Sequence, residues 1–466
     1  MDAISFSIKN NVSNVELDLI HEVNSKKDFA KLINNTFDNT FYMSYKNSEY
    51  IIWDSLKKLL QDVKPSLNLI FLKKHITFGE SFGYETAWEN VFLLLPGATI
   101  TLNSKSVECI YEPWFRGQYS ERNIIVQQHP VKALMESLPP LDKPVLLEFS
   151  GGTDSTSIAY AISERSNALS VTWGDPNSQN SSDINHAIRI AKKLKISHKI
   201  DLIDPNDLFL LPPREYLPDR PSVSILSMAQ KDKFIKSQVS TSDLFVLNGH
   251  GGDHIFLDPP NPIVTIDLLM KGNIFSAIRY YRKISDFYGE GLLAPLRYRN
   301  VGRGIGNHRF TLTPGKYLHK RMIQQACYEN SVWNNCGLSY RMVHPFTQPA
   351  MLHYAMNIAP HKFVDKYQSR FPFRQSMNQH FSTEDFSRIS KGHLTGLFQQ
   401  AVSQNYHYLA ELLNSGVGQK YGIYRSEDML PCLKMVAIGG ASIEPALMNA
   451  LAMEIFFVHW SRVLGE

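Results

Sequence analysis

The chain has 466 residues, of which 43% are hydrophobic and 20% are charged. This length gives room for two or three domains, and this composition is typical of globular proteins with a large core rather than of disordered chains. The formal net charge is +4, from 48 basic and 44 acidic residues. Such a balanced charge gives no support to a nucleic-acid partner or to binding at a membrane surface.

The cysteines and the N-terminus indicate the compartment. The spacing of Cys109, Cys327, Cys336 and Cys432 fits neither a disulfide framework nor a zinc site. Residues 1–9 lack the charged start and apolar run of a signal peptide, and the chain contains no uninterrupted apolar stretch of about 18 residues. We therefore expect reduced thiols, no membrane segment and a cytoplasmic location.

The first 120 residues are predicted to form a small β-rich domain. Its expected strands are Ser5–Ile8, Thr40–Tyr45, Tyr50–Trp53 and Ala98–Leu102. Helical periodicity predicts helices at Lys27–Asn34 and Trp53–Asp62, and a helical apolar run before the turn at Pro96 and Gly97. We interpret the polar stretch Arg116–Asn123 as the linker to a second domain, 126–466.

In this second domain strands alternate with helices. The expected strands are Val145–Phe149, Leu169–Trp173, His198–Leu202 and Leu244–Leu247, and the expected helices are 155–163, Ser182–Leu194 and Ser224–Ser237. Strands joined by helical crossovers predict an α/β fold with a doubly wound parallel sheet, whose ligands bind at the carboxyl ends of the strands. After residue 256 the chain is expected to be mostly helical, up to a last helix at Ile443–Leu464.

The run Ser150-Gly151-Gly152-Thr153-Asp154-Ser155 lies between an apolar strand and a helix. Glycines let backbone N–H groups approach an anion closely, and the helix directs its positive end at the same point. The run lacks the lysine of a Walker loop and resembles the SGGxDS pyrophosphatase loop of enzymes that split ATP between the α and β phosphates. This resemblance implies ATP contacts at Ser150, Gly151, Gly152, Asp154 and Ser155. An ordinary glycine-rich turn is the alternative.

A second glycine-rich turn, Asn248–Asp253, follows the strand Leu244–Leu247. A magnesium ion that shields triphosphate oxygens needs carboxylates from separate loops, and Asp154 and Asp253 each follow a glycine cluster at a strand end. We therefore expect Asp154 and Asp253 to bind Mg²⁺. A helix N-cap is the alternative role for Asp253.

With these two loops the chain resembles the asparagine synthetase family, in particular the synthetase domain that asparagine synthetases share with β-lactam and carbapenam synthetases and with lasso peptide cyclases. The resemblance covers roughly residues 85–400, including Gly337–Phe346, which has two extra residues before Pro345, and the basic segment Phe386–His393. It implies the fold of the ATP pyrophosphatases, with ATP and Mg²⁺ as cofactors. It also places at Lys391 the family's catalytic lysine, which stabilises charge on phosphate and on the tetrahedral adduct. A solvated surface lysine is the alternative.

Position 250 departs from this family, because asparagine synthetases hold Glu there and β-lactam synthetases hold the Tyr of a catalytic dyad. An α-amine, with a pKa of about 7.7–8.0, is mostly protonated at neutral pH and needs a base to attack, and an imidazole with a pKa of about 6.5 suits that role. We therefore expect His250 to be a catalytic base, with Glu329 as the carboxylate that orients it. A histidine that only shapes the loop is the alternative.

The resemblance also places adenine at the strand ends, with contacts at Leu147, Trp173 and Asn248, next to Gly249; filling of the core is an equal alternative for Trp173. Family members that hydrolyse glutamine carry a cysteine directly after the initiator Met. Here Asp2 holds that position. We therefore expect a degenerate glutaminase-like N-terminal domain of the N-terminal-nucleophile type, without glutaminase activity.

Together these features predict a lasso peptide cyclase. ATP would activate an Asp or Glu side-chain carboxylate of a precursor peptide as an acyl-adenylate, and the N-terminal amine of the peptide would close a macrolactam, with release of AMP and pyrophosphate. A leader peptidase and a leader-binding protein of the same pathway are implied as partners. The alternatives are a β-lactam or carbapenam-type synthetase, an ammonia-dependent asparagine synthetase, and a non-catalytic nucleotide- or peptide-binding protein of this fold.

Overall fold

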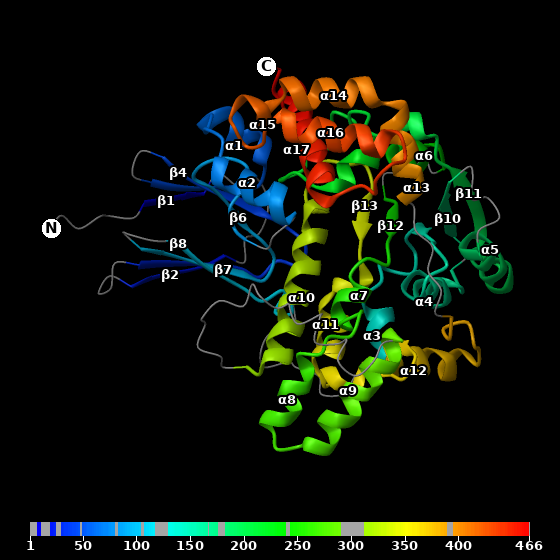
Figure 1. Cartoon of the computed structure of the whole chain (residues 1–466). Coiled ribbons are helices and arrows are strands. Elements are labelled where there is room, and N and C mark those ends of the chain that lie inside the picture. Colours follow the sequence, from blue (N-terminus) through cyan, green and yellow to red (C-terminus); the bar gives the residue numbers. More distant parts are fainter. Residues whose placement is uncertain are drawn as a thin grey trace.

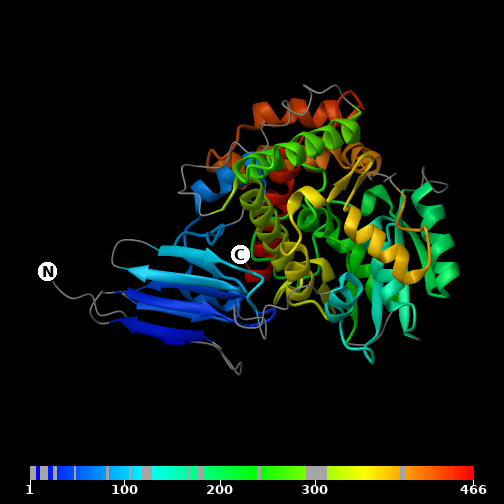
Figure 2. The ribbon, with the colours of Figure 1, turned by 90° about the horizontal axis from the view of Figure 1, so that it is seen from below.

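The structure is a computed structural model. It describes residues 7–10, 19–24, 29–46, 49–79, 83–103, 107–116, 129–165, 167–175, 182–238, 243–289, 312–388 and 395–465. Figure 1 shows two stacked sheets in the N-terminal part of the chain and a separate sheet in the later part. Seen from below, in Figure 2, the helices α10 and α17 lie between these two regions.

The N-terminal part is β-rich, as predicted. One sheet has the strand order β1-β5-β4-β6 and the other has the order β2-β3-β7-β8. The strands are β1 (Ser7–Asn10), β2 (Leu19–Asn24), β3 (Phe29–Asn34), β4 (Phe41–Lys46), β5 (Glu49–Trp53), β6 (Val91–Leu94), β7 (Ala98–Asn103) and β8 (Val107–Tyr111). Leu32, Met43 and Ile100 are among the side chains from both sheets that are almost fully buried. The relation of this sandwich to a glutaminase domain stays a prediction.

Two helices predicted in this part are wrong, and one was missed. The segment predicted as a helix at Lys27–Asn34 contains β3, which pairs with β2 on one side and β7 on the other. The apolar run before Pro96 is also a strand, β6, paired with β4. Short apolar runs fit the periodicity of a helix as well as that of a strand. In these two segments, pairing with neighbouring strands determines that a strand forms. The helix α1 (Leu56–Val63) was predicted, whereas α2 (Leu69–Phe78), which Asn68 caps, was not.

The second part contains the predicted doubly wound sheet. Its strands are β9 (Val145–Glu148), β10 (Ala168–Gly174), β11 (Ser197–Leu202), β12 (Phe245–Leu247) and β13 (Arg341–Val343). They lie in the order β11-β10-β9-β12-β13, and all neighbouring strands are parallel. The winding direction reverses between β9 and β12, so the loops that follow these two strands open side by side. These are the two glycine-rich loops.

The helices around and after this sheet also agree with the sequence. The helix α3 (Pro130–Glu136), which was not predicted, precedes β9. The helices between the strands are α4 (Thr153–Ile162), α5 (Ser182–Leu194) and α6 (Met228–Gln238), the last preceded by a 3₁₀ turn at Val223–Ser227. The later elements are α7 (Gly252–Ile255), α8 (Val264–Met270), α9 (Ile274–Tyr288), α10 (Pro314–Asn330), α11 (Pro349–Met356), β14 (Val364–Asp365), β15 (Gln368–Ser369), α12 (Phe371–Phe381), α13 (Thr395–Gln404), α14 (Tyr406–Ser415), α15 (Val417–Lys420), α16 (Ser426–Ala437) and α17 (Pro445–Leu464). Within the described residues, no helix combines the length and apolarity needed to cross a membrane. All four cysteines are free thiols.

The two parts of the chain pack closely against each other. The indole rings of Trp88 and Trp460 meet edge to face with their centroids 5.7 Å apart. Arg116 is buried and donates to the carbonyl oxygens of Pro113, at 2.7 Å, and Thr347, at 2.5 Å. The first residue of the predicted linker therefore fixes the N-terminal part to the second part, whereas 117–123 lie outside the described residues.

Asp385 fastens the segment after α12 to α4 and α5. Its carboxylate accepts hydrogen bonds from the Tyr160 hydroxyl at 2.5 Å and from the Lys193 and Arg189 side chains, each at 2.7 Å. Burial alone would raise the pKa of Asp385, but the hydrogen bonds from Lys193, Tyr160 and Arg189 hold this pKa below its ordinary value. The folded state thus favours the ionised carboxylate.

We expect Asp385→Asn to lower the free energy of unfolding at pH 7 by about 1–2 kcal/mol, because both cationic partners are largely exposed and their attraction is screened. A carboxylate whose pKa is lowered by folding stabilises the protein above its unfolded-state pKa of about 3.9, and this stabilisation is lost as the pH falls. Denaturant unfolding measured from pH 7 towards pH 3 should show that the difference in the free energy of unfolding between variant and wild type becomes smaller. A gap of constant size would contradict the role of the ionised carboxylate.

Candidate active site

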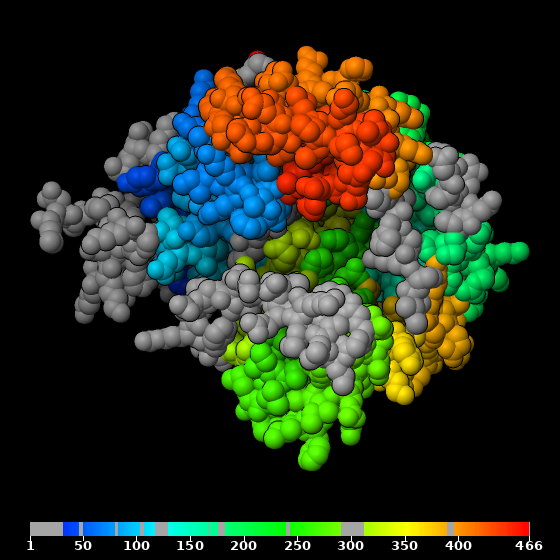
Figure 3. All heavy atoms as spheres, viewed as in Figure 1, coloured from blue at the N-terminus to red at the C-terminus, as the bar shows by residue number. Residues whose placement is uncertain are grey.

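The loops after β9 and β12 line a cavity of about 580 Å³, which is in the size range of small-molecule sites, about 300–1,000 Å³. The predicted site residues that line it are Ser150, Gly151, Gly152, Asp154, Ser155, Trp173, Asn248, Gly249, His250 and Asp253. Leu147 is fully buried in β9 and is not among the lining residues. Figure 3 shows the molecular surface hollowed between the C-terminal helices above and α8 and α9 below.

The two loops approach each other so closely that only glycine fits at their contacts. A Cβ atom at Gly249 would lie 3.0 Å from the Asp154 Cβ, and one at Gly252 would overlap the Asp154 carboxylate. Gly151 has a φ of +73°, in the left-handed region that favours glycine. The N-terminal turn of α4 has no side-chain cap, and its residues Thr153, Asp154 and Ser155 line the cavity. The uncapped N-terminus of a helix can bind an anion through its backbone N–H groups.

Three carboxylates converge on one guanidinium beside this loop. Arg370, immediately before α12, contacts Asp154 at 2.5 Å, Asp258 at 2.7 Å, and Asp253. Arg370 is only 5% exposed, and the guanidinium of Arg374, which is also buried and lines the cavity, interacts electrostatically with Asp154 and Asp258. Three carboxylates against two guanidiniums leave one net negative charge, and carboxylate oxygens are the ligands that Mg²⁺ prefers. Asp154 and Asp253, the predicted magnesium ligands, are therefore brought together, and Asp258 joins them.

A buried glutamate connects three elements on one side of the cavity. Glu148, the last residue of β9, accepts hydrogen bonds from Trp173 Nε1 at 3.0 Å, from Lys231 Nζ at 2.9 Å, and from the Asn248 amide. These three partners come from β10, α6 and the loop after β12, and all line the cavity. Glu148 thus fixes the positions of Trp173 and Asn248, the two lining residues predicted to contact adenine.

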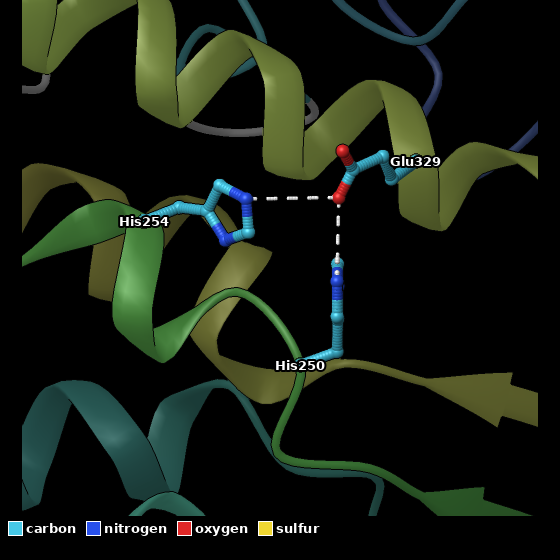
Figure 4. A group of neighbouring side chains, drawn as sticks. All are labelled: His250, His254 and Glu329. Atoms are coloured by element: carbon cyan, nitrogen blue, oxygen red, sulfur yellow. Dashed lines mark ion pairs between the residues drawn. The ribbon is translucent and has the colours of Figure 1, made fainter. Parts of the chain in front are cut away.

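His250 lies against Glu329, as Figure 4 shows. The His250 Nε2 is 3.3 Å from the Glu329 Oε2, and the His254 Nε2 is 3.7 Å from the same oxygen. The His250 Nδ1 lies 2.8 Å from the Asn330 Oδ1. Because the Asn330 amide nitrogen donates to the Thr347 hydroxyl, its oxygen is the acceptor, and the His250 Nδ1 carries the hydrogen. The His250 Nε2 is therefore the ring atom directed at Glu329.

Of the ionisable groups at this pair, Glu329 is held ionised and His344 is held neutral. Burial alone would raise the pKa of Glu329, but hydrogen bonds from His250 and Gln325 hold it below its ordinary value, so the carboxylate is ionised at neutral pH. The ring of His344 lies 6.2 Å from that of His250, centroid to centroid. Burial, together with the charges of His250 and Lys231, holds the pKa of His344 well below its ordinary value. His344 therefore stays neutral, and Glu329 is available to stabilise a positive charge on His250.

Residues 132–295 match the family model described as asparagine synthase. The part of the chain that contains both glycine-rich loops is therefore similar to the asparagine synthase family. It is also similar to the microcin J25-processing protein McjC of Escherichia coli, with 20% identity over 392 residues, which cover 82% of this chain and 74% of that protein. The predicted family resemblance is thereby confirmed.

The asparagine synthase match includes both glycine-rich loops but ends before Glu329 and Arg370. Lys391 lies outside the described residues. The described chain stops three residues earlier, at Arg388, whose guanidinium contacts Asp183 and lies 3.4 Å from the Gly151 carbonyl oxygen. The basic segment of the asparagine synthase resemblance therefore begins beside the phosphate loop.

Sequence reasoning missed Glu148, Lys231, Asp258 and Arg370. Asp258 had a usable indication, because it follows Asp253 by five residues just after the same short helix. Arg370 is 216 residues from Asp154 along the chain, and no local pattern marks it as a partner. Lys231 likewise meets Glu148 across 83 residues.

Proposed function

We propose that this protein is an AMP-forming, ATP-dependent ligase that closes a macrolactam between an Asp or Glu side-chain carboxylate and the N-terminal amine of a precursor peptide. The observation that carries this proposal is a cavity lined by the glycine-rich loop at the start of α4 and by His250, whose ring contacts Glu329. The similarity to a protein that processes microcin J25 supports a peptide substrate.

In the first half-reaction, a carboxylate oxygen of the peptide attacks the α-phosphorus of ATP, and the bond to the leaving pyrophosphate breaks. Backbone N–H groups at the start of α4 and the hydroxyls of Ser150 and Ser155 bind the phosphates. Asp154, Asp253 and Asp258 would hold Mg²⁺, which neutralises phosphate charge when bound. Arg370 keeps these carboxylates together, and Lys391 stabilises the charge that develops in both half-reactions.

In the second half-reaction, the peptide amine attacks the activated carbonyl carbon, and AMP leaves with the electron pair of the broken bond. The amine must lose a proton, and the pair of His250 and Glu329 takes it. The positive charge that forms on His250 is stabilised by the ionised carboxylate 3.3 Å away. The Asn330 amide oxygen holds the ring in place through Nδ1.

The cysteines support an amine that comes from the peptide rather than from glutamine. Burial raises the pKa of Cys109, Cys327 and Cys336 to about 12 each. Such thiols are almost entirely protonated at neutral pH, whereas a nucleophilic cysteine acts as the thiolate. These three cysteines are therefore unsuited to act as a glutaminase nucleophile. Since Asp2 holds the position of the nucleophilic cysteine in the glutamine-hydrolysing relatives, we propose that the protein releases no ammonia from glutamine.

His250→Gln is expected to separate the two half-reactions. Adenylation, measured as hydroxylamine trapping of the activated carboxylate, should persist, because the phosphate loop and the carboxylate cluster stay intact. Ring closure, measured by mass spectrometry of the peptide, should fall by about 10²–10⁴, the usual contribution of a positioned base. The loss should be partly recovered towards pH 9, where an amine with a pKa of about 7.7–8.0 is deprotonated unaided.

Glu329→Gln should give the same split, and His407→Gln, at an exposed histidine far along the chain, serves as the matched control. Equal loss of both half-reactions in His250→Gln, or normal ring closure at pH 7, would show that His250 only shapes the loop. Adenylation of a free small amino acid, but of no peptide, would favour the β-lactam-type alternative.

A further inference from the structure

His250, His254 and Glu329 form a compact group with the dimensions of a metal site. Their ligand atoms, the two Nε2 atoms and one carboxylate oxygen, all lie within 4.8 Å of one another. The two nitrogen-to-oxygen separations are 3.3 and 3.7 Å. A tetrahedral zinc ion with bonds of about 2.0–2.2 Å needs ligand atoms about 3.3–3.6 Å apart, so the 3.3 Å edge fits and the 3.7 Å edge lies just beyond this range.

Neighbouring groups hold His250 and Glu329 in the orientation that a metal requires. The Asn330 oxygen accepts the hydrogen of the His250 Nδ1, which directs the Nε2 at the shared centre. Gln325 donates to the Glu329 Oε1 at 2.8 Å and leaves the Oε2 facing both imidazoles, as Figure 4 shows. Metal-binding histidines and carboxylates typically have such hydrogen-bonded partners, which fix ring orientation.

The group is accessible, because His250 and His254 both line the cavity. The side chains of His254 and Glu329 are about one-fifth to one-quarter exposed, at 21% and 25%. Three protein ligands with an open fourth position correspond to the His₂Glu arrangement known for zinc. Imidazole ligands favour Zn²⁺ and related transition metals, whereas the carboxylates around Arg370 favour Mg²⁺.

We propose that His250, His254 and Glu329 bind one transition-metal ion of the Zn²⁺ type, at a site separate from the magnesium cluster. The consequence rests on the proposed function. The ion would occupy the Nε2 of His250 and the Oε2 of Glu329, the atoms that take the proton of the attacking amine. Bound zinc therefore inhibits amide formation and leaves the rate of adenylation unchanged.

The site is tested by calorimetric titration of ZnCl₂ into the metal-stripped full chain in buffer containing Mg²⁺. The wild type should bind one ion, and His254→Gln and Glu329→Gln should each weaken binding by at least about tenfold. His407→Gln and Cys432→Ser are the controls, since these residues lie outside the group, and binding should be unchanged in both. Co²⁺ in place of Zn²⁺ should give the visible absorption of a tetrahedral ion in the wild type and in both controls, but not in His254→Gln or Glu329→Gln.

Equal zinc affinity in the wild type and His254→Gln would overturn the site. The inhibitory consequence is measured separately, as the zinc concentration that halves ring closure in each protein relative to its own uninhibited rate. This concentration should rise at least about tenfold in His254→Gln. Zinc binding is measured without nucleotide or peptide, so it does not depend on the ligase proposal. If the zinc site is absent but the ligase proposal holds, His250→Gln should still retain adenylation and lose ring closure.

Discussion

Asp154→Asn and Asp253→Asn are each expected to abolish ATP–pyrophosphate exchange, to below about one-hundredth of the wild-type rate. Both changes keep side-chain size and remove one charge from the cluster around Arg370, so the attraction for a divalent ion and its hold on phosphate oxygens are weakened. A metal ion contributes several kcal/mol to a phosphoryl-transfer transition state, and each 1.4 kcal/mol is about tenfold in rate. Exchange of radiolabelled pyrophosphate into ATP measures the effect.

The fold of both variants should be retained, which circular dichroism and thermal unfolding will show. Asp243→Asn is the matched control, because Asp243 lies before β12, at the opposite end of the strand from the cavity, and pairs with Lys143 at the surface. Its exchange rate should equal that of the wild type. Retained exchange in either purified cluster variant would contradict the shared magnesium site.

Lys391→Met is expected to reduce turnover by about 10²–10³, or roughly 3–4 kcal/mol, while nucleotide affinity stays within about tenfold. The reason is that the charge which this lysine neutralises develops mainly in the transition state. Arg388, three residues earlier, lies beside Gly151, which supports the placement of the basic segment near the reacting phosphates. Single-turnover kinetics and equilibrium binding of a non-hydrolysable nucleotide measure the two quantities.

Lys132→Met, in the exposed part of α3, controls for the general loss of a positive charge. Normal turnover of Lys391→Met at saturating substrate would mean that the lysine was assigned wrongly. A parallel loss of affinity and turnover would instead indicate a role in binding ATP rather than in the chemical steps.

The parallel sheet could be predicted because each of its central strands is a short apolar run that ends at a polar or glycine-rich turn. β9 is buried along its whole length, so the apolar run in the sequence corresponds directly to a buried strand in the structure. The strands of the N-terminal sandwich were harder to predict from the sequence. β3 is amphipathic and short, and its identity as a strand depends on pairing with β7, some seventy residues later along the chain.

The site was predictable to the extent that its residues belong to local motifs. Asp154 and Asp253 follow glycines at strand ends, and His250 stands out within its loop. By contrast, Arg370 is positioned by the turn before α12 and meets Asp154 only through the fold. Long-range electrostatic partners leave no periodicity or spacing in the sequence, so they can be found only in three dimensions.

The hydrogen bond from Arg116 to Thr347 connects the N-terminal part of the chain to the candidate site. The Arg116 guanidinium holds the Thr347 carbonyl oxygen, the Thr347 hydroxyl accepts from Asn330, and the Asn330 oxygen orients His250. None of the described residues of the N-terminal part lines the cavity, yet Arg116 is linked to His250 through three successive hydrogen bonds. If the N-terminal part were replaced by that of another protein, the hydrogen bond from Arg116 would be lost. The orientation of His250 would then be less well fixed, even if every residue that lines the cavity were kept.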